Sequence, residues 1–192
     1  SSFRYVAFLA EIASTCNEAL LSDYLVAHAA DRQEKAYLLM GKLEDIRQTI
    51  FRQTMFSEFE RQVHGFAEAS TPITATLLEE TYRNLIQKYY GPGFTLDPDD
   101  GLEWAYIPHF YYKYYVYAYA TGLSSGIAIA DRVREQGQPA VDAYLEMLAG
   151  GCSAPPLELL ADAGVNLARP DAIAAAMRTF AATLDEVERL LR

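Results

Sequence analysis

The absence of proline over the first third of the chain is the feature that most limits what this sequence can fold into. No proline occurs between Phe3 and Thr71, so nothing in this stretch interrupts a helix. Apolar side chains recur there at intervals of three and four residues, the spacing of one face of an α-helix. They are Leu9, Ile12, Cys16, Leu20, Leu38, Leu39, Leu43, Ile46 and Ile50. The pattern predicts one helix over residues 3–29 and a longer second helix over residues 32–68.

Loops and further helices are expected beyond this stretch. Thr74 is a suitable N-cap for a helix that ends at Tyr90, and the glycines, prolines and aspartates of GPGFTLDPDDG, residues 91–101, predict a loop. Pro108 is expected in the first turn of a helix that reaches residue 120. Later helices are predicted at 123–136, 139–149 and 171–191, with a second loop, GGCSAPP, at 150–156. No alternation of period two persists, so we expect an all-α fold, a multi-helix array that forms a single unit over residues 1–192.

Charge and composition exclude several classes of partner. The chain has 16 Lys and Arg against 26 Asp and Glu, a net charge of −10. Nucleic-acid binding needs a basic face, so no nucleic-acid partner is expected. The longest apolar runs are far shorter than the roughly 20 residues that span a bilayer, and no signal-peptide pattern is visible, so no membrane partner is expected either. Cys16 and Cys152 are too few for a disulfide framework and indicate reduced thiols in a cytoplasmic protein.

A dense group of tyrosines is the most unusual local feature. Half of the 14 tyrosines fall within residues 106–119, in the segment AYIPHFYYKYYVYAYATG. On one continuous helix Tyr112 and Tyr119 would project within about 20° of each other and Tyr115 within about 60°, whereas Tyr117 would point away. Two interpretations remain open. The rings either form an aromatic packing seam, or they present hydroxyl donors along one wall of a cleft, suited to an oxyanion or a peptide backbone.

Residues 122–126, GLSSG, match the G-x-S-x-G pattern of a nucleophile elbow. That motif needs a strand before the serine and a histidine downstream, but a helical segment precedes it here and no histidine follows His109. We therefore interpret the match as accidental and do not expect Ser124 to be a nucleophile. Gly122 and Gly126 are instead expected to mark a helix break or a close helix crossing.

Glu11 stands among apolar residues in the sequence FLAEIA. A buried carboxylate must be paired, protonated or metal-bound. Glu18 follows seven residues later on the same helix face. The residues alone leave open an ion pair between Glu11 and an Arg or Lys elsewhere, and no pair of histidines four residues apart is present to complete a zinc site.

Three blocks of the sequence resemble a known family. They are FLAEIASTCNEALLSDYL, then EWAYIPHFYYKYYVYAYATG about 90 residues later, and then GGCSAPPLELLADAGVN. Over essentially the whole chain they resemble the C-terminal part of the oligoendopeptidase F family, zinc peptidases related to thimet oligopeptidase and neurolysin. The family's His-Glu-x-x-His helix, which supplies two zinc ligands and the general-base glutamate, is absent. We therefore expect this chain to be the portion of the catalytic domain that follows that helix; a stand-alone homologue that lacks zinc is the alternative.

The resemblance implies roles for individual residues. Glu11 matches the family's third ligand to its single zinc ion. Tyr119 best matches the tyrosine that donates to the oxyanion, with Tyr112 seven residues before it in a related catalytic role. Glu18 would hold a zinc-ligating histidine through a hydrogen bond. The other residues that the resemblance places along the substrate cleft are the catalytic His109 and the substrate-binding Tyr111 and Tyr115.

The implied function is that of a zinc-dependent endopeptidase that hydrolyses short oligopeptides. Its partners would be peptide substrates and the upstream part of the same catalytic domain. This chain alone is expected to be inactive, because one carboxylate cannot hold zinc in a three-ligand site. The family often has Arg where Tyr106 stands, so a salt bridge made by that Arg is not expected here. The alternatives from other classes are a non-catalytic helical peptide-binding module and a structural domain whose tyrosines form its core.

Overall fold

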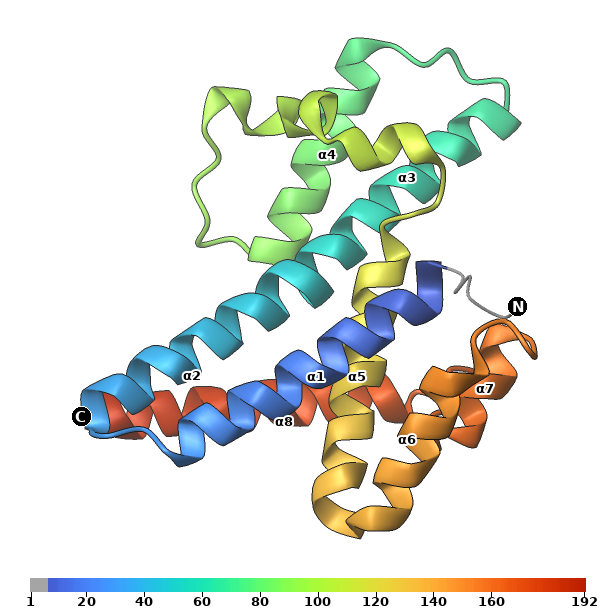
Figure 1. Ribbon diagram of the computed structural model, residues 1–192. Helices are drawn as coiled ribbons and strands as arrows, with labels where there is room; N and C mark the ends of the chain where they lie inside the picture. Colours follow the sequence, from blue (N-terminus) through green and yellow to red (C-terminus); the bar gives the residue numbers. More distant parts are fainter. Residues whose placement is uncertain (1–6) are drawn as a thin grey trace. The chain divides into compact units, whose positions relative to one another are not determined.

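A computed structural model describes residues 7–192, and every regular element in this range is helical (Figure 1). The all-α prediction is therefore confirmed, while the first residues of the helix expected from Phe3 lie outside the described range. The α-helices are α1 (Ala7–Ala27), α2 (Arg32–Ile46), α3 (Arg52–Glu68), α4 (Ala75–Tyr90), α5 (Tyr117–Gln136), α6 (Gln138–Gly150), α7 (Pro156–Asp162) and α8 (Asp171–Leu191). A π-helical turn, η1 (Arg47–Phe51), and two 3₁₀ helices, η2 (Pro98–Tyr106) and η3 (Pro108–Tyr112), complete the set. No helix within residues 7–192 combines the length and the apolar character needed to cross a membrane.

The helices group into two compact units rather than the one body expected from the sequence. The first unit combines the chain up to Ile50 with Ala118–Arg192, and the second is the continuous segment Phe51–Tyr117. No composition change or flexible linker in the sequence marks either boundary. That both units belong to one peptidase catalytic domain stays a prediction.

The first unit is built on contacts of α1 with α2 and α7, of α2 with α8, and of α6 with α7. Its main core cluster joins α1 and α5–α7 and includes Leu9, Ile12, Cys16, Ile129, Tyr144, Met147 and Leu160. The hydroxyl of Tyr144 on α6 donates to the backbone carbonyl of Ala13 at 3.1 Å, which satisfies a buried phenol at the α1 surface. The helix predicted at 171–191 coincides with α8. Its apolar positions lie on one face, and Pro170, which cannot sit inside a helix, marks the residue before it begins.

The second unit packs α3 against α4 and closes with η2 and η3. Its core is aromatic, with Phe56, Phe59 and Tyr82 buried. Thr74 caps α4 as predicted, and its side chain accepts a hydrogen bond from the backbone N–H of Leu77 at 3.2 Å. The predicted loop at 91–101 is shorter than expected, because Asp97 and Asp100 form a reciprocal capping box that starts η2 at Pro98.

The continuous helix predicted for residues 108–120 was wrong. The chain forms η3, then turns through Lys113 (φ +56°) and Tyr114 (φ +49°), and α5 starts only at Tyr117. The buried carboxylate of Glu60 on α3 accepts a hydrogen bond from the backbone N–H of Tyr114, and Val116 fills the core of this unit. These tertiary contacts outweigh the local helical preference of the segment.

Other boundaries also differ from prediction. The long helix predicted at 32–68 begins after Asp31, whose side chain caps α2, and it contains the π-helical turn η1, which the sequence analysis did not predict. No helix break occurs at Gly122 or Gly126, because α5 runs through both. An additional short helix, α7, follows the loop at 150–156.

Candidate active site

The crossing of α1 and α5 depends on two glycines spaced four residues apart. A Cβ atom placed on Gly122 would lie 3.0 Å from the Cβ of Glu11, and one placed on Gly126 would lie 2.5 Å from Thr15 Oγ1. The two helices cross in the first unit, with α1 passing over α5 (Figure 1). The close crossing predicted as one role for these glycines is therefore confirmed, since only glycine lets the backbones approach this closely.

Thr15 holds this crossing together. Its hydroxyl lies 2.7 Å from the Glu11 carbonyl on α1 and 3.1 Å from the Gly122 carbonyl on α5, so its one proton is shared in a three-centre hydrogen bond that links the two helices. The side chain is buried, so the hydroxyl group reaches its acceptors away from competing water. This fixes the backbone of Glu11 against α5, and the Glu11 carboxylate is the candidate zinc ligand.

Glu11 is half-buried on α1, beside Gly122. Tyr119, also half-buried, precedes Gly122 by three residues on α5. Residues three apart on a helix project within about 60° of each other. Tyr119 therefore belongs to the face of α5 that turns toward α1, one helical turn before the glycine that contacts Glu11.

The second unit brings together three of the other predicted residues. The His109 ring stacks on Tyr115 with centroids 5.8 Å apart, and it meets the edge of Tyr112 at 6.3 Å. His109 and Tyr115 are half-buried, and Tyr112 is exposed. Tyr111 is also exposed, and its hydroxyl donates to the Ala105 carbonyl at 3.1 Å.

Two interpretations of the tyrosine group can now be corrected. Tyr112 lies in η3 and Tyr119 in α5, so the argument that they share one helix face was wrong, because the turn at Lys113 separates the two elements. The rings of Tyr106 and Tyr111 are each 72% exposed and Tyr112 is 67% exposed. This row is therefore not a buried packing seam.

Glu18 is exposed on α1 and lines a separate hollow of about 350 Å³ between α1, α2 and α5. The wall of this hollow also includes Thr15, Ser22, Lys42 and Thr49. Asp45 adds a second carboxylate, and Ile46, Leu123 and Ile127 make the rest of the wall apolar. The hydrogen bond from Glu18 to a zinc-ligating histidine stays a prediction.

Ser124 lies within α5 and is only 1% exposed. Its hydroxyl donates to the Ala120 carbonyl one turn earlier, at 2.7 Å. A serine oriented in this way cannot reach a substrate. The interpretation of GLSSG as an accidental match to a nucleophile elbow agrees with this geometry.

Several polar residues near the tyrosines escaped sequence analysis. Tyr82 is fully buried, and its hydroxyl donates to Glu103 at 2.5 Å, while Arg52 pairs with the same carboxylate. Burial, with the carboxylate beside it, raises the pKa of Tyr82 well above its ordinary value. His64 stacks on Tyr114 with centroids 4.3 Å apart. Only tertiary packing brings these residues together, so no sequence spacing could have indicated them.

No group of three or more His, Cys, Asp and Glu side chains within residues 7–192 is arranged to hold a metal ion. A half-buried carboxylate such as Glu11 is a suitable oxygen donor to zinc, but a catalytic zinc site requires three protein ligands. The described part of the chain therefore fits one ligand position of such a site and does not form the site by itself.

Comparison with known proteins gives the family. The oligopeptidase PepF of Bacillus subtilis (strain 168) is 47% identical over 187 residues, which cover 97% of this chain and 28% of that protein. The chromosomal oligoendopeptidase F of Lactococcus lactis subsp. cremoris is 41% identical, with 97% of this chain and 31% of that protein covered. The crystal structure of oligoendopeptidase-F from Enterococcus faecium matches with a TM-score of 0.91 and 42% identity, over 97% of this chain and 36% of that one.

This chain thus spans less than a third of the length of these two curated relatives. The model of peptidase family M3 matches residues 1–179. This match covers most of the sequence and agrees with the helical fold shared with the Enterococcus structure. The chain therefore belongs to peptidase family M3.

Proposed function

We propose that the full-length protein is a zinc-dependent endopeptidase that cleaves short oligopeptides, and that this chain supplies one zinc ligand, Glu11, and part of the wall of the substrate cleft. The observation that carries the proposal is the placement of Glu11 on α1 against Gly122 of α5, with Tyr119 one turn earlier on α5. The matches to named oligopeptidases support the substrate class. The remaining two ligands and the general base would come from the upstream part of the same catalytic domain.

In this proposal each residue has a defined task. Bound zinc would polarise the scissile carbonyl and lower the pKa of a water molecule. Glu11 contributes a negatively charged oxygen whose position is set by the Thr15 and Gly122 contacts of its backbone. Tyr119 donates its phenol proton in a hydrogen bond to the oxygen that becomes negatively charged as the carbonyl is attacked.

The aromatic residues of the second unit bind the peptide. His109, Tyr112 and Tyr115 form one group of rings with exposed edges and hydroxyls, and Tyr111 extends it. Such groups donate hydrogen bonds to peptide carbonyls and pack against side chains with little loss of conformational entropy. His109 and Tyr112 are assigned to catalysis, and Tyr111 and Tyr115 to substrate binding.

The experiment that tests the proposal is Glu11→Gln in the full-length protein. A neutral amide is a much poorer zinc ligand than a carboxylate, so bound zinc and peptide hydrolysis should both be lost while the helical circular dichroism is kept. Glu146→Gln, an exposed glutamate on α6 with no assigned role in the site, is the control and should keep zinc near one equivalent. A Glu11→Gln protein with unchanged zinc and activity would exclude Glu11 as a ligand. The present chain alone should neither hold zinc nor hydrolyse a quenched oligopeptide.

A further inference from the structure

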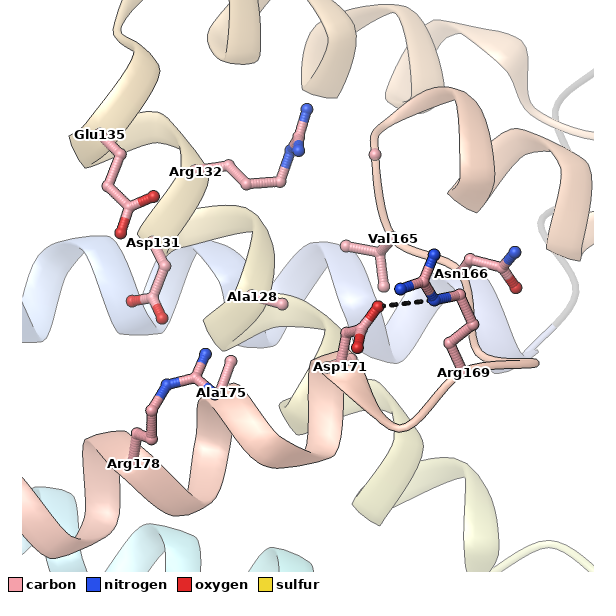
Figure 2. A pocket seen from close by; sticks show the side chains of 12 residues that line it. Ala128, Asp131, Arg132, Glu135, Val165, Asn166, Arg169, Asp171, Ala175 and Arg178 are labelled. Atoms are coloured by element: carbon pink, nitrogen blue, oxygen red, sulfur yellow. Dashed lines mark ion pairs between the residues drawn. The ribbon is translucent and has the colours of Figure 1, made fainter.

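The charges around the hollow between α5 and α8, in the first unit, are balanced (Figure 2). Three carboxylates and three arginines line it: Asp131, Glu135 and Asp171, with Arg132, Arg169 and Arg178. Asp171 and Arg169 pair with each other at 2.9 Å, as the dashed line in Figure 2 shows. This hollow therefore favours neither an anion nor a cation. In the second unit, by contrast, one buried carboxylate is directed at a single turn of the chain.

That turn, at Lys113 and Tyr114, has a backbone conformation that residues with a side chain rarely adopt. The two φ values are +56° and +49°, and Ser70 is the only other non-glycine residue within residues 7–192 with a positive φ. Two such residues in succession are costly, and they persist only where the surrounding structure enforces them. The contacts of the turn must therefore provide that enforcement.

The chain on either side of the turn is fixed in the aromatic core of the second unit. Before the turn, the centroid of the Phe110 ring lies 5.4 Å from that of Phe56 and 5.2 Å from that of Phe59. After the turn, Val116 is fully buried in the same core. Residues 111–114 are exposed between these two contacts, so the conformation of the turn decides how their side chains are presented.

Two side chains of α3, one helical turn apart, hold Tyr114. The carboxylate of Glu60 accepts a hydrogen bond from the backbone N–H of Tyr114, and the His64 ring stacks on the tyrosine ring with centroids 4.3 Å apart. Glu60 is only 5% exposed, and no Lys or Arg within residues 7–192 forms an ion pair with it. A buried carboxylate needs a polar partner, and the backbone of the turn supplies one.

The turn brings together residues that lie on its two sides. His109 precedes it in η3 and Tyr115 follows it, and their rings stack with centroids 5.8 Å apart and 19° between the planes. Tyr112, whose edge meets His109, directly precedes the turn. Because φ and ψ are the soft dihedrals of the backbone, a change of φ within the turn would rotate Tyr115 relative to His109.

We propose that Glu60 and His64 are positioning residues for peptide binding. By holding the turn at Tyr114, they fix the stacked rings of His109 and Tyr115 in the arrangement that receives the substrate. The roles of His109 and Tyr115 are those of the proposed function, on which this assignment rests. Neither Glu60 nor His64 needs to touch the peptide, because rings that are already in their bound arrangement lose less conformational entropy on binding.

The test compares Glu60→Leu with Tyr82→Phe in the full-length protein, by hydrolysis of a quenched oligopeptide. Both variants remove a buried hydrogen bond from the second unit, since the Tyr82 hydroxyl donates to Glu103, but only Glu60→Leu releases the turn. In Glu60→Leu we expect kcat/KM to fall by about 10- to 100-fold, with KM raised and bound zinc unchanged. Tyr82→Phe should leave KM unchanged even where it lowers the melting temperature. Hydrogen exchange of peptides that cover residues 108–117 should be faster in Glu60→Leu alone.

Further substitutions separate positioning from general stabilisation. Glycine adopts a positive φ without a steric penalty, so Lys113→Gly in the Glu60→Leu background should recover part of the lost kcat/KM. Lys113→Gly alone should keep the KM of the unaltered protein. His64→Ala should raise KM, and His64→Phe should keep it near the unaltered value because a phenyl ring preserves the stack on Tyr114.

The outcomes distinguish this assignment from the proposed function. If the unaltered protein does not hydrolyse the peptide, the proposed function fails and the role in peptide binding falls with it, while the exchange data show whether Glu60 holds the turn. If the unaltered protein is active, a Glu60→Leu protein whose KM is no higher than that of Tyr82→Phe, or no recovery by Lys113→Gly, overturns the assignment. Should Glu60→Leu not fold, equal KM values in His64→Ala and His64→Phe overturn it.

Discussion

The contact between α1 and α5 predicts that Gly126→Ala destabilises the protein although alanine is the better helix former. A Cβ at this position would lie 2.5 Å from Thr15 Oγ1, 2.7 Å from the backbone nitrogen of Cys16 and 2.9 Å from the Thr15 carbonyl carbon. Two of these three atoms are backbone and cannot move by a change of rotamer. The new methyl group must therefore separate the two helices.

The magnitude follows from three contributions. Replacing a mid-helix glycine by alanine stabilises by about 1 kcal/mol through helix propensity. Overpacking in a tight contact costs about 1–3 kcal/mol. Separation of the helices also removes the contact of Thr15 with the Gly122 carbonyl, and such a hydrogen bond contributes about 1 kcal/mol. The sum is a net loss of about 1–3 kcal/mol.

Gly41→Ala is the matched control, because Gly41 is also within a helix and an added Cβ there has no neighbour within 4 Å. This variant should be more stable by about 0.5–1 kcal/mol. Urea unfolding of the full-length protein measures both effects, and hydrogen exchange of α1 peptides shows where protection is lost. If Gly126→Ala unfolds at the same urea concentration as Gly41→Ala, or at a higher one, then α1 and α5 do not pack as described.

Three further predictions concern single side chains. Tyr119→Phe should lower kcat by roughly 10²–10³ with KM almost unchanged, the pattern of a hydrogen bond made only in the transition state. The Lys88 ammonium, together with a hydrogen bond from Tyr89, holds the pKa of Glu58 below its ordinary value of 4.5. The Glu58–Lys88 pair should therefore stabilise the protein above pH 4.5, and this stabilisation should be lost as the pH falls through the lowered pKa of Glu58. Burial raises the pKa of the Cys16 thiol to about 11, so this thiol should resist alkylation at pH 8 in the folded protein.

Each of these has a control within the chain. Tyr117→Phe removes a phenol about 160° away around α5 and should leave kcat unchanged; equal losses in both variants would remove the special role of Tyr119. Lys88→Met should reduce the acid-dependent change in stability assigned to Glu58, because Lys88 is the main cause of the lowered pKa, and an unchanged pH profile would contradict the assignment. The exposed Cys152 should be alkylated under conditions that spare Cys16, which mass spectrometry of the two peptides can verify.

Local chemistry allowed much of the fold to be predicted from the sequence. Thr74 was predicted to start its helix because it offers a side-chain acceptor followed by apolar periodicity, and Asp31 caps α2 by the same chemistry. Pro170 and the apolar stripe after it define α8. These signals act within a few residues, so they can be read without knowledge of the partners.

The features that the sequence did not reveal depend on distant residues. The turn at Tyr114 forms because the carboxylate of Glu60, on another helix, accepts its N–H. A close helix crossing at Gly122 was among the expectations, but its partner Glu11 lies on a helix far away in the sequence and was not predicted. The roles of Glu11 and Tyr119 came from family resemblance, since a carboxylate among apolar residues is equally compatible with an ion pair.

The order of the two units along the chain has a consequence for biosynthesis. The Thr15–Gly122 contact closes a loop of 107 residues that contains the entire second unit, Phe51–Tyr117. Closing a disordered loop of this length costs conformational entropy. If the inserted segment folds first, the part of the loop that is still disordered is shorter and this cost is smaller. We expect the second unit to fold on the ribosome as soon as its sequence has emerged, whereas α1 must wait for α5. Ile12 and Cys16 are both fully buried in the folded protein, and until α5–α7 are made they lack their contacts with these helices. A nascent chain stalled at this stage exposes these apolar side chains and should bind chaperones.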